Sequence, residues 1–359
     1  MTKTPISRPR FAQLSDRAEL VGLVALCLVG LAVVAVGAGW VTGPSATLVV
    51  VVLVVCLVLL ILTAFVGGGE TRKRLAPYGL LNPGVLWLSL FFLAPLWSLL
   101  VMSLSAKTSR FDFFPDFSWH WENYKTALTD FRPQFVRSFS YAGIATLLTL
   151  IIGYPLAYVI AFRGGKYRNA LLGLVVIPFF TSYLIRTLAW QNILADAGPA
   201  VGFVERFHLT GALESLDIMK NGQLLNTPAA VIGGLTYNFL PFMILPIYVS
   251  LEKVDVRLVD AAQDLYSSSA RAFRKIVLPL SLPGVFAGTL LTFIPAAGDF
   301  VNAELLGSPN TTMIGNSIQD QFIQQNNWPV AAAMSFVLMV IITVAVLVYT
   351  RFIGTEELA

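Results

Sequence analysis

Two ionisable side chains lie within or beside long apolar stretches of this sequence. Asp299 follows the apolar stretch 276–298, and Arg186 is the only charged residue between Arg168 and Asp196. Charged groups at membrane depth are costly and usually face a bundle interior or water. Two interpretations of Asp299 stay open. It is either a carboxylate on a path that attracts cations, or, with Glu304, a group that caps or solvates a helix end at the outer interface.

Arg186 also has two interpretations. It snorkels to the outer headgroups, or it pairs with a carboxylate such as Asp196 or Asp299 to latch an outer gate. Three aromatic residues in the apolar stretches can stack on a passing cation, each contact contributing roughly 0.5–2 kcal/mol. The alternative for these aromatics is a place in the interfacial aromatic belt. They are Trp190, Tyr237 and Phe239.

A polar segment, residues 252–280, interrupts the apolar sequence. Positions 255–265 have apolar residues at helical spacing, which predicts a short helix: Val256, Val259, Ala262 and Leu265. A second helical turn, 270–277, carries apolar Phe273, Ile276 and Val277 opposite basic residues. Pro279 and Pro283 are expected to stop or kink the chain after it. A small apolar face of this kind either docks a partner or lies on the membrane surface.

The elements that must position these residues are membrane-spanning helices. Only 12% of the 359 residues are charged and 56% are hydrophobic, and the charges leave several long stretches empty. A helix needs roughly 20 apolar residues to cross the hydrocarbon core. The stretches do not alternate as barrel strands do. We therefore predict an all-α integral membrane protein with eight spans: 20–41, 47–67, 83–104, 138–162, 169–194, 228–250, 281–303 and 329–351.

Basic residues predict the orientation of these spans. They gather in the amino-terminal tail and in the loops that follow spans two, four and six. Cytoplasmic loops carry an excess of Lys and Arg, so these four regions and both termini are predicted to be cytoplasmic. The loop 252–280 therefore faces the cytoplasm.

Several functional classes find no support in the sequence. Cys27 and Cys56 lie in apolar stretches without metal-site spacing. No glycine motif of the form GxxxxGK[ST] is present to cradle a phosphate. We therefore expect no metal, no cofactor, no catalytic residue and no nucleic-acid partner. If ATP drives this protein, another chain must bind it.

The cytoplasmic segment resembles the coupling loop of ABC-importer permeases, whose pattern is E-A-A, three residues, G, nine residues, then I-x-L-P. Asp260-Ala261-Ala262 stands for E-A-A, Tyr266 for the glycine, and Ile276 to Pro279 for I-x-L-P. Tyrosine in place of glycine puts the local turn geometry in question, because glycine allows a left-handed turn. The resemblance assigns these coupling residues: Asp260, Ala261, Ala262, Leu265, Tyr266, Phe273, Ile276, Leu278 and Pro279.

The resemblance extends over roughly residues 80–352 and is strongest to the spermidine/putrescine-type branch. The segments that carry it are 153–157, 177–190, 293–307, 313–315 and 327–329. It implies a six-helix type I permease core, 80–352, with the coupling loop 252–280. Residues 20–67 are then two additional amino-terminal helices, and 1–19 and 353–359 are cytoplasmic tails.

The resemblance also implies the partners and the activity. The partners are a dimer of ABC ATPase subunits, a second permease subunit and an extracytoplasmic solute-binding protein, in the lipid of a bacterial cytoplasmic membrane. The chain is then a transport subunit and not an enzyme, and its cargo is a polyamine such as spermidine or putrescine. Asp299, with the three aromatic residues and Arg186, becomes the candidate translocation path. The alternatives are a secondary transporter driven by an ion gradient and a membrane-embedded enzyme.

Overall fold

The structure is a computed structural model that describes residues 87, 91–92, 94–107, 116–216, 218–264 and 268–353. Contacts divide them into two units, one ending at His120 and the other beginning at Trp121. The predicted spans 20–41 and 47–67 lie outside the described residues, as do the predicted tails apart from Ile353. The prediction of eight spans is therefore tested only in part.

The first unit contains the end of the predicted span 83–104. Helix α4 covers Ala94–Ser103. Strand β1 (Ser105–Ala106) then pairs antiparallel with β2 (Asp116–Phe117). The amide of His120 donates to the carbonyl of Leu104, which closes this small loop.

The second unit is mainly helical in its described residues. Its α-helices there are α5 (Glu122–Thr129), α6 (Arg132–Tyr158), α7 (Arg168–Val176), α8 (Tyr183–Leu194), α9 (Pro199–Arg206), α10 (Thr210–Ser215), α11 (Pro228–Glu252), α12 (Val256–Asp264), α13 (Ser269–Ala272), α14 (Leu278–Ala297), α15 (Val301–Leu306), α16 (Ile314–Gln319) and α17 (Trp328–Ile353). Short π or 3-10 turns join some of them: η2 (Val159–Arg163), η3 (Gly165–Tyr167), η4 (Ile177–Phe180), η5 (Phe273–Val277), η6 (Pro309–Thr311) and η7 (Asp320–Gln324).

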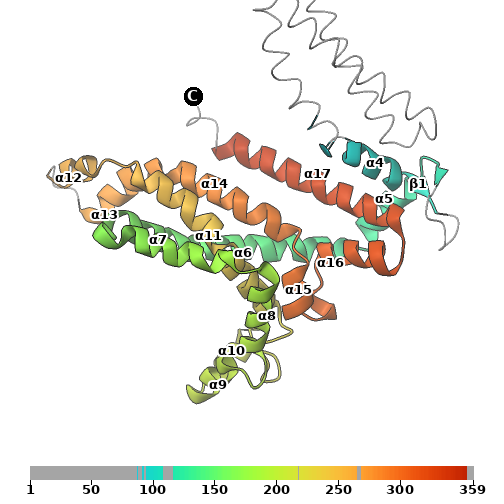
Figure 1. The fold of residues 1–359 in the computed structure, drawn as a ribbon, viewed down its shortest axis with the longest axis horizontal. Helices are drawn as coiled ribbons and strands as arrows, with labels where there is room; N and C mark the ends of the chain where they lie inside the picture. Colours follow the sequence, from blue (N-terminus) through green and yellow to red (C-terminus); the bar gives the residue numbers. More distant parts are fainter. Residues whose placement is uncertain are drawn as a thin grey trace, which may run out of the picture. The chain divides into compact units, whose positions relative to one another are not determined.

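Four helical segments of this unit are long and apolar enough to cross a membrane, and a bent pair makes a fifth if it counts as one span. The four are Arg132–Arg163, Pro228–Glu252, Ser269–Ala297 and Trp328–Arg351. Figure 1 shows them as a bundle with α12, α13 and the start of α7 at one end and α5 and α16 at the other. The spans predicted at 138–162, 228–250, 281–303 and 329–351 are confirmed as helices, with changed bounds.

The predicted span 169–194 is not one helix but part of a bent pair of helical segments. The segments Gly165–Phe180 and Tyr183–Arg206 meet at 94°. Proline lacks the N–H that a helix interior needs, and Pro178 begins the tight turn η4. Thr181 and Ser182 then adopt extended backbone with ψ of 148° and 140°. Helices α8, α9 and α10 consequently leave the bundle as a side arm, residues 183–215 (Figure 1).

The expected stop at Pro279 is wrong, since the helical segment continues through it. Residues Ser269–Ala297 form one helical segment, so the span begins twelve residues earlier than the predicted 281 and ends before Gly298. Pro279 lies in the first turn of α14, where a missing N–H costs little. The π-helical turn η5 directly before it adjusts the backbone register.

Close helix contacts hold the bundle together where α6, α11 and α14 meet. A Cβ on Gly284 would lie 2.5 Å from the carbonyl oxygen of Pro246. A Cβ on Gly288 would lie 2.8 Å from the sulfur of Met243. Small residues at helix interfaces let backbones approach closely, and such packing drives helix association in lipid. These two glycines therefore fix the distance between α11 and α14.

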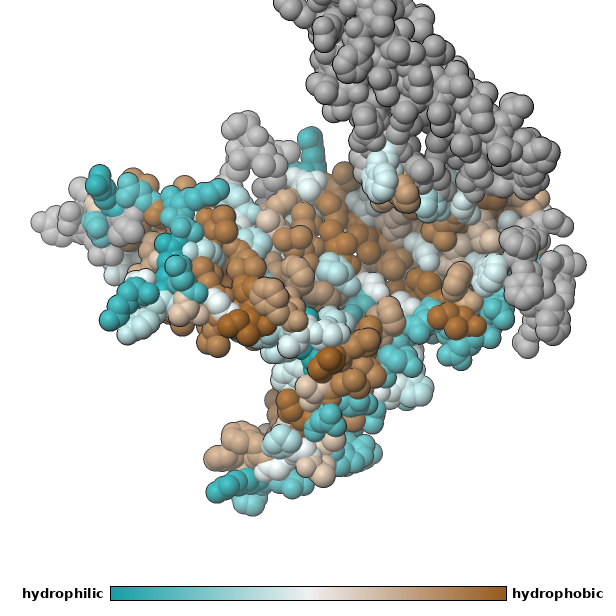
Figure 2. Space-filling model, viewed as in Figure 1, coloured by the Kyte–Doolittle hydropathy of each residue, from teal (hydrophilic) through white to brown (hydrophobic). Residues whose placement is uncertain are grey.

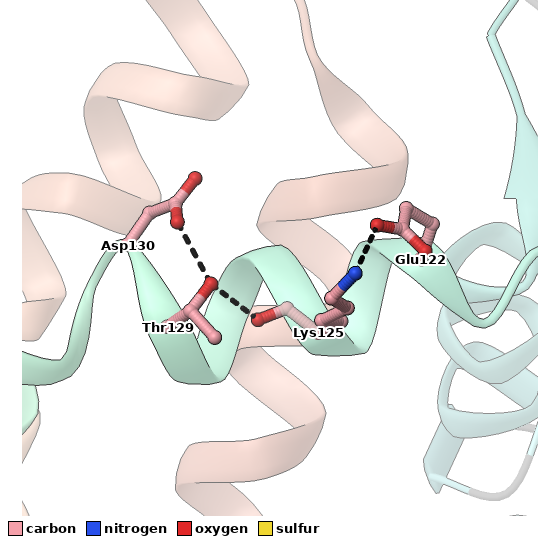
Figure 3. A network of polar contacts seen from close by, with 4 residues as sticks. All are labelled: Glu122, Lys125, Thr129 and Asp130. Carbon is pink, nitrogen blue, oxygen red and sulfur yellow. Dashed lines mark hydrogen bonds and ion pairs between the residues drawn. The ribbon is translucent and has the colours of Figure 1, made fainter.

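The surface of the bundle is apolar over its middle and polar at the end that carries α12 and α13 (Figure 2). At the opposite end, α5 presents a polar surface (Figure 3). Lys125 Nζ lies 3.1 Å from Glu122 Oε1, and Thr129 bonds both Asp130 and the carbonyl of Lys125. Apolar middle and polar ends are the pattern expected of a membrane-spanning bundle.

Candidate functional site

The predicted coupling helix forms at one end of the bundle. Helix α12 begins after Asp255, whose carboxylate accepts a hydrogen bond of 2.9 Å from the amide of Arg257. Val259 is half-buried against the neighbouring core cluster. Leu258, Asp260 and Ala261 are exposed, with Leu258 at 50%. The helix therefore has one face packed on the bundle through Val259 and one face open, whereas the sequence predicted that its apolar side would be exposed.

Two of the assigned coupling residues, Leu265 and Tyr266, lie outside the described residues. The chain resumes at Ser268, whose side chain accepts a hydrogen bond from the amide of Arg271 and so caps α13. This is the N-cap arrangement typical of serine. Ala262, Ile276, Leu278 and Pro279 are all half-buried.

Phe273 connects the coupling segment to the bundle. Its ring meets the rings of Tyr154 and Tyr158 on α6 edge to face, with centroids 5.9 Å and 5.7 Å apart. Edge-to-face contacts of this kind each contribute about 0.5–1.5 kcal/mol beyond their buried area. The hydroxyl of Tyr154 lies 2.8 Å from Ser281 Oγ on α14. Packed side chains therefore link this segment to both α6 and α14.

A buried polar network lies at the far end of α14. Asp299 is 9% exposed and accepts a hydrogen bond from the hydroxyl of Tyr183. Its other oxygen accepts from the backbone amide and the side-chain amide of Asn302, at 2.8 Å and 3.2 Å. A carboxylate at this depth needs such donors, because an unpaired charge is costly there. Asp299 thus caps the first turn of α15 and ties it to α8.

Two amides extend this network into α11. The side-chain amide of Asn238 donates to Asn302 Oδ1 and to Thr187 Oγ1, both at 3.1 Å. Asn238, Asn302 and Thr187 are buried. The network therefore joins α8, α11 and α15. Sequence reasoning missed Tyr183, Asn238 and Asn302, although an asparagine within the charge-free stretch 221–251 was a usable signal.

The predicted aromatic residues lie close to this network. Trp190 and Tyr237 meet edge to face with centroids 5.3 Å apart. Phe239 is buried, with its ring 6.3 Å from that of Tyr183. Phe239 thus contacts the tyrosine that is bonded to Asp299, whereas Trp190 of α8 and Tyr237 of α11 contact each other.

Arg186 stacks on aromatic rings of its own segment. Its guanidinium lies 4.3 Å from the Phe179 ring centroid and 5.8 Å from that of Tyr183. Asp196, one predicted partner, accepts a hydrogen bond of 2.9 Å from Gln223. Asp299, the other, is bonded by Tyr183 and Asn302. Within the described ranges, no group of three or more His, Cys, Asp or Glu is placed to hold a metal ion.

Known proteins with similar sequences are permeases of polyamine transport systems. The spermidine/putrescine transport system permease protein PotB of Haemophilus influenzae is 40% identical over 267 residues, covering 74% of this chain and 90% of that protein. PotB of Escherichia coli is 37% identical, covering 74% and 93%. Similarity at this level over most of both chains shows a common family.

Solved structures agree on the fold. A bacterial ABC transporter involved in the import of the acidic polysaccharide alginate matches with a TM-score of 0.57 at 16% identity, covering 80% of this chain and 98% of that one. The family described as binding-protein-dependent transport system inner membrane component matches residues 128–353, which hold α6 to α17 and the coupling segment. The chain therefore belongs to this family of inner-membrane transport components.

Proposed function

We propose that this chain is the permease subunit of an ABC importer that carries a polyamine, spermidine or putrescine, across the cytoplasmic membrane. The observation that carries the proposal is the 40% identity to a spermidine/putrescine permease, over 90% of that protein's length. Membership of the inner-membrane family makes the chain a multi-pass membrane protein of an ABC system with ATPase and binding-protein partners.

The proposed assembly contains two ATPase subunits, a second permease and an extracytoplasmic solute-binding protein. ATP is hydrolysed on the ATPase subunits, since these 359 residues hold no phosphate-cradling GxxxxGK[ST] motif. The open face of α12, with Asp260 and Ala261, docks in a groove of one ATPase. Packed interfaces have discrete arrangements, so a helix seated in a groove transmits the closure of the ATPase dimer.

The proposed cargo path passes Asp299 and its aromatic neighbours. In the observed state, the chain's own donors occupy the carboxylate of Asp299. A polyamine ammonium reaches it only when the Tyr183 bond opens, as rocking of the two permeases would allow. Trp190, Tyr237 and Phe239 then offer ring faces to the cation. The carboxylate attracts the cargo without holding it permanently, because Tyr183 and Asn302 compete for the same oxygens.

Uptake by the reconstituted complex tests the proposal. Proteoliposomes containing this chain with its co-purified partners receive radiolabelled spermidine bound to the cognate binding protein. We expect saturable uptake that needs internal ATP and is reduced by unlabelled putrescine. Uptake that continues without the ATPase subunits, or stops when an ionophore collapses the ion gradient while ATP is present, would support a secondary transporter instead. Spermidine uptake that does not saturate and stays at the background level would rule out a polyamine as the cargo.

A further inference from the structure

A cluster of polar side chains joins α7 to the cytoplasmic end of α11. Arg168, the first residue of α7, forms an ion pair through Nη2 with Glu252, the last residue of α11. Its Nε donates a hydrogen bond to the hydroxyl of Tyr248. The guanidinium also lies 4.9 Å from the Tyr248 ring centroid. One arginine therefore makes three contacts with the last two turns of α11.

These contacts differ from an ordinary surface ion pair. A solvated pair alone contributes about 0–1 kcal/mol, because two mobile side chains must be held in place. Here the Arg168 side chain is only 30% exposed and is fixed by the Tyr248 ring, while Tyr248 is itself buried. Arginine suits this role because its planar guanidinium can stack and pair at the same time.

Glu252 stands directly before the coupling helix. Lys253, Val254 and Asp255 form the whole connection between α11 and α12. The amides of Lys253 and Val254 donate to the carbonyls of Ser250 and Leu251. Val254 is 7% exposed. The connection is a short hydrogen-bonded turn in which Val254 is buried, so a displacement of α12 also moves the end of α11.

Arg168 stands at the start of the broken span. Leu171, Leu172 and Val175 of α7 pack against the core cluster that contains Tyr248 and Leu251. Beyond α7 lie η4 and the 94° bend into α8. Helix α8 contributes Tyr183 and Thr187 to the buried polar network. The chain is helical on either side of the bend, so movement at Arg168 would be passed along α7 to that bend.

We propose that Arg168 and Glu252 form a clamp, positioned by Tyr248, that makes the coupling helix α12 and the α7 half of the broken span move as one body during transport. This role rests on the proposed function for its driving force, the ATPase acting on α12. The clamp assigns positioning roles to three residues outside the coupling pattern and the candidate path.

The direct test is the distance between α7 and α12 in the full complex. Spin labels are placed at Leu174→Cys on α7 and Leu258→Cys on α12, both exposed positions, in a background of Cys27→Ser and Cys56→Ser. Pulsed electron paramagnetic resonance measures the distance in lipid nanodiscs, without nucleotide and with ATP plus vanadate. We expect the same distance in both states for the parent protein, because the clamp joins the two helices.

Charge reversal tests whether the ion pair is the cause. Arg168→Glu or Glu252→Arg alone should broaden the distance distribution and shift it between the two states. The double variant, Arg168→Glu with Glu252→Arg, should restore the parent distribution. Lys166→Glu, an exposed reversal of the same sign in the preceding turn η3, should leave it unchanged. The clamp would be overturned if the parent distance changed with ATP and vanadate. It would also be overturned if the single variants gave the parent distance distribution, or if the double variant gave the same distribution as the single variants.

Transport separates failure of the clamp from failure of the proposed function. Single reversals should lower spermidine uptake per ATP hydrolysed by about tenfold, a usual size for coupling between distant sites, and the double variant should recover most of it. If the parent complex takes up no spermidine but shows the expected distances, spermidine is not the cargo and the clamp still holds. Normal uptake per ATP in both single variants refutes the clamp and keeps the cargo.

Discussion

The hydroxyl of Tyr183, the first residue of α8, donates a hydrogen bond to the buried carboxylate of Asp299 just beyond the end of α14. This single bond joins the base of the side arm to the far end of a membrane-spanning helix. Asp299 keeps its two contacts with Asn302 when the bond opens. The carboxylate therefore remains partly hydrogen-bonded in either state, as the proposed cation site requires.

Tyr183→Phe removes the hydroxyl of this bond, which also accepts a hydrogen bond from the side-chain amide of Asn302. A hydrogen bond to a charged group contributes about 1.5–3 kcal/mol, so we expect a lower melting temperature for the purified complex. Tyr237→Phe is the control, since the structure shows a ring contact with Trp190 for Tyr237 and no bond that depends on its hydroxyl. Equal melting temperatures for the two variants would contradict a stabilising role for the Tyr183 bond.

Asp299→Asn keeps the shape of the side chain and removes its charge. If Asp299 attracts the cargo, spermidine uptake at limiting substrate should fall by about tenfold, equivalent to 1.4 kcal/mol of lost attraction, with a smaller loss at saturation. The control is Asp130→Asn, an exposed carboxylate after α5. Unchanged uptake at limiting spermidine would show that Asp299 is not part of the cargo path and acts only as a helix cap.

Gly284→Ala tests the approach of α14 to α11. The added methyl would meet the Pro246 carbonyl at 2.5 Å and the Ile247 Cα at 2.8 Å, both backbone atoms that cannot move aside cheaply. Overpacking of this kind typically costs about 1–3 kcal/mol. Gly143→Ala on α6 is the control, because nothing lies within 4 Å of the added methyl. Thermal unfolding of both complexes should show a lower melting temperature for Gly284→Ala and an unchanged one for Gly143→Ala.

Phe273→Ala removes the ring that lies against Tyr154 and Tyr158. Two aromatic contacts and part of a half-buried side chain are lost, so we expect about 1–3 kcal/mol of destabilisation, below the 3–5 typical of a fully buried Phe. We also expect fewer solute molecules to be transported per ATP hydrolysed, because the coupling segment loses its ring contacts with α6. Phe180→Ala, at an 87% exposed position, is the control. ATPase activity and uptake measured on one preparation would show whether coupling or folding has failed.

Charge-free stretches predicted the long helices of the bundle well, because a membrane leaves little choice but an apolar helix. Helical spacing of apolar residues also predicted the short helices at 255–265 and 270–277, although it did not predict that Val259 and Phe273 pack on the core. The bend at Thr181 and Ser182 was not predicted. Hydropathy continues through η4 into α8, whereas the break depends on the extended backbone of two residues.

For the candidate path, the sequence predicted the charged and aromatic residues but not their hydrogen-bond partners. Asp299 stood out by its charge, but its partners Tyr183 and Asn302 come from distant or unremarkable positions. Polar neighbours such as these depend on how α8, α11 and α15 meet, which no local pattern encodes. Arg168 and Glu252 were missed for the same reason. Both look like ordinary interfacial charges until α7 and α11 are brought together.

The central claim is that an ATPase grips α12 from the cytoplasm. A photo-reactive amino acid in place of Ala261, which is exposed on α12, tests it directly in membranes containing the intact transporter. Illumination should link this chain to an ATP-binding subunit, and the same substitution at exposed Phe207 in the loop after α9 should not. Linkage only to lipid or to an extracytoplasmic protein at Ala261 would contradict the account.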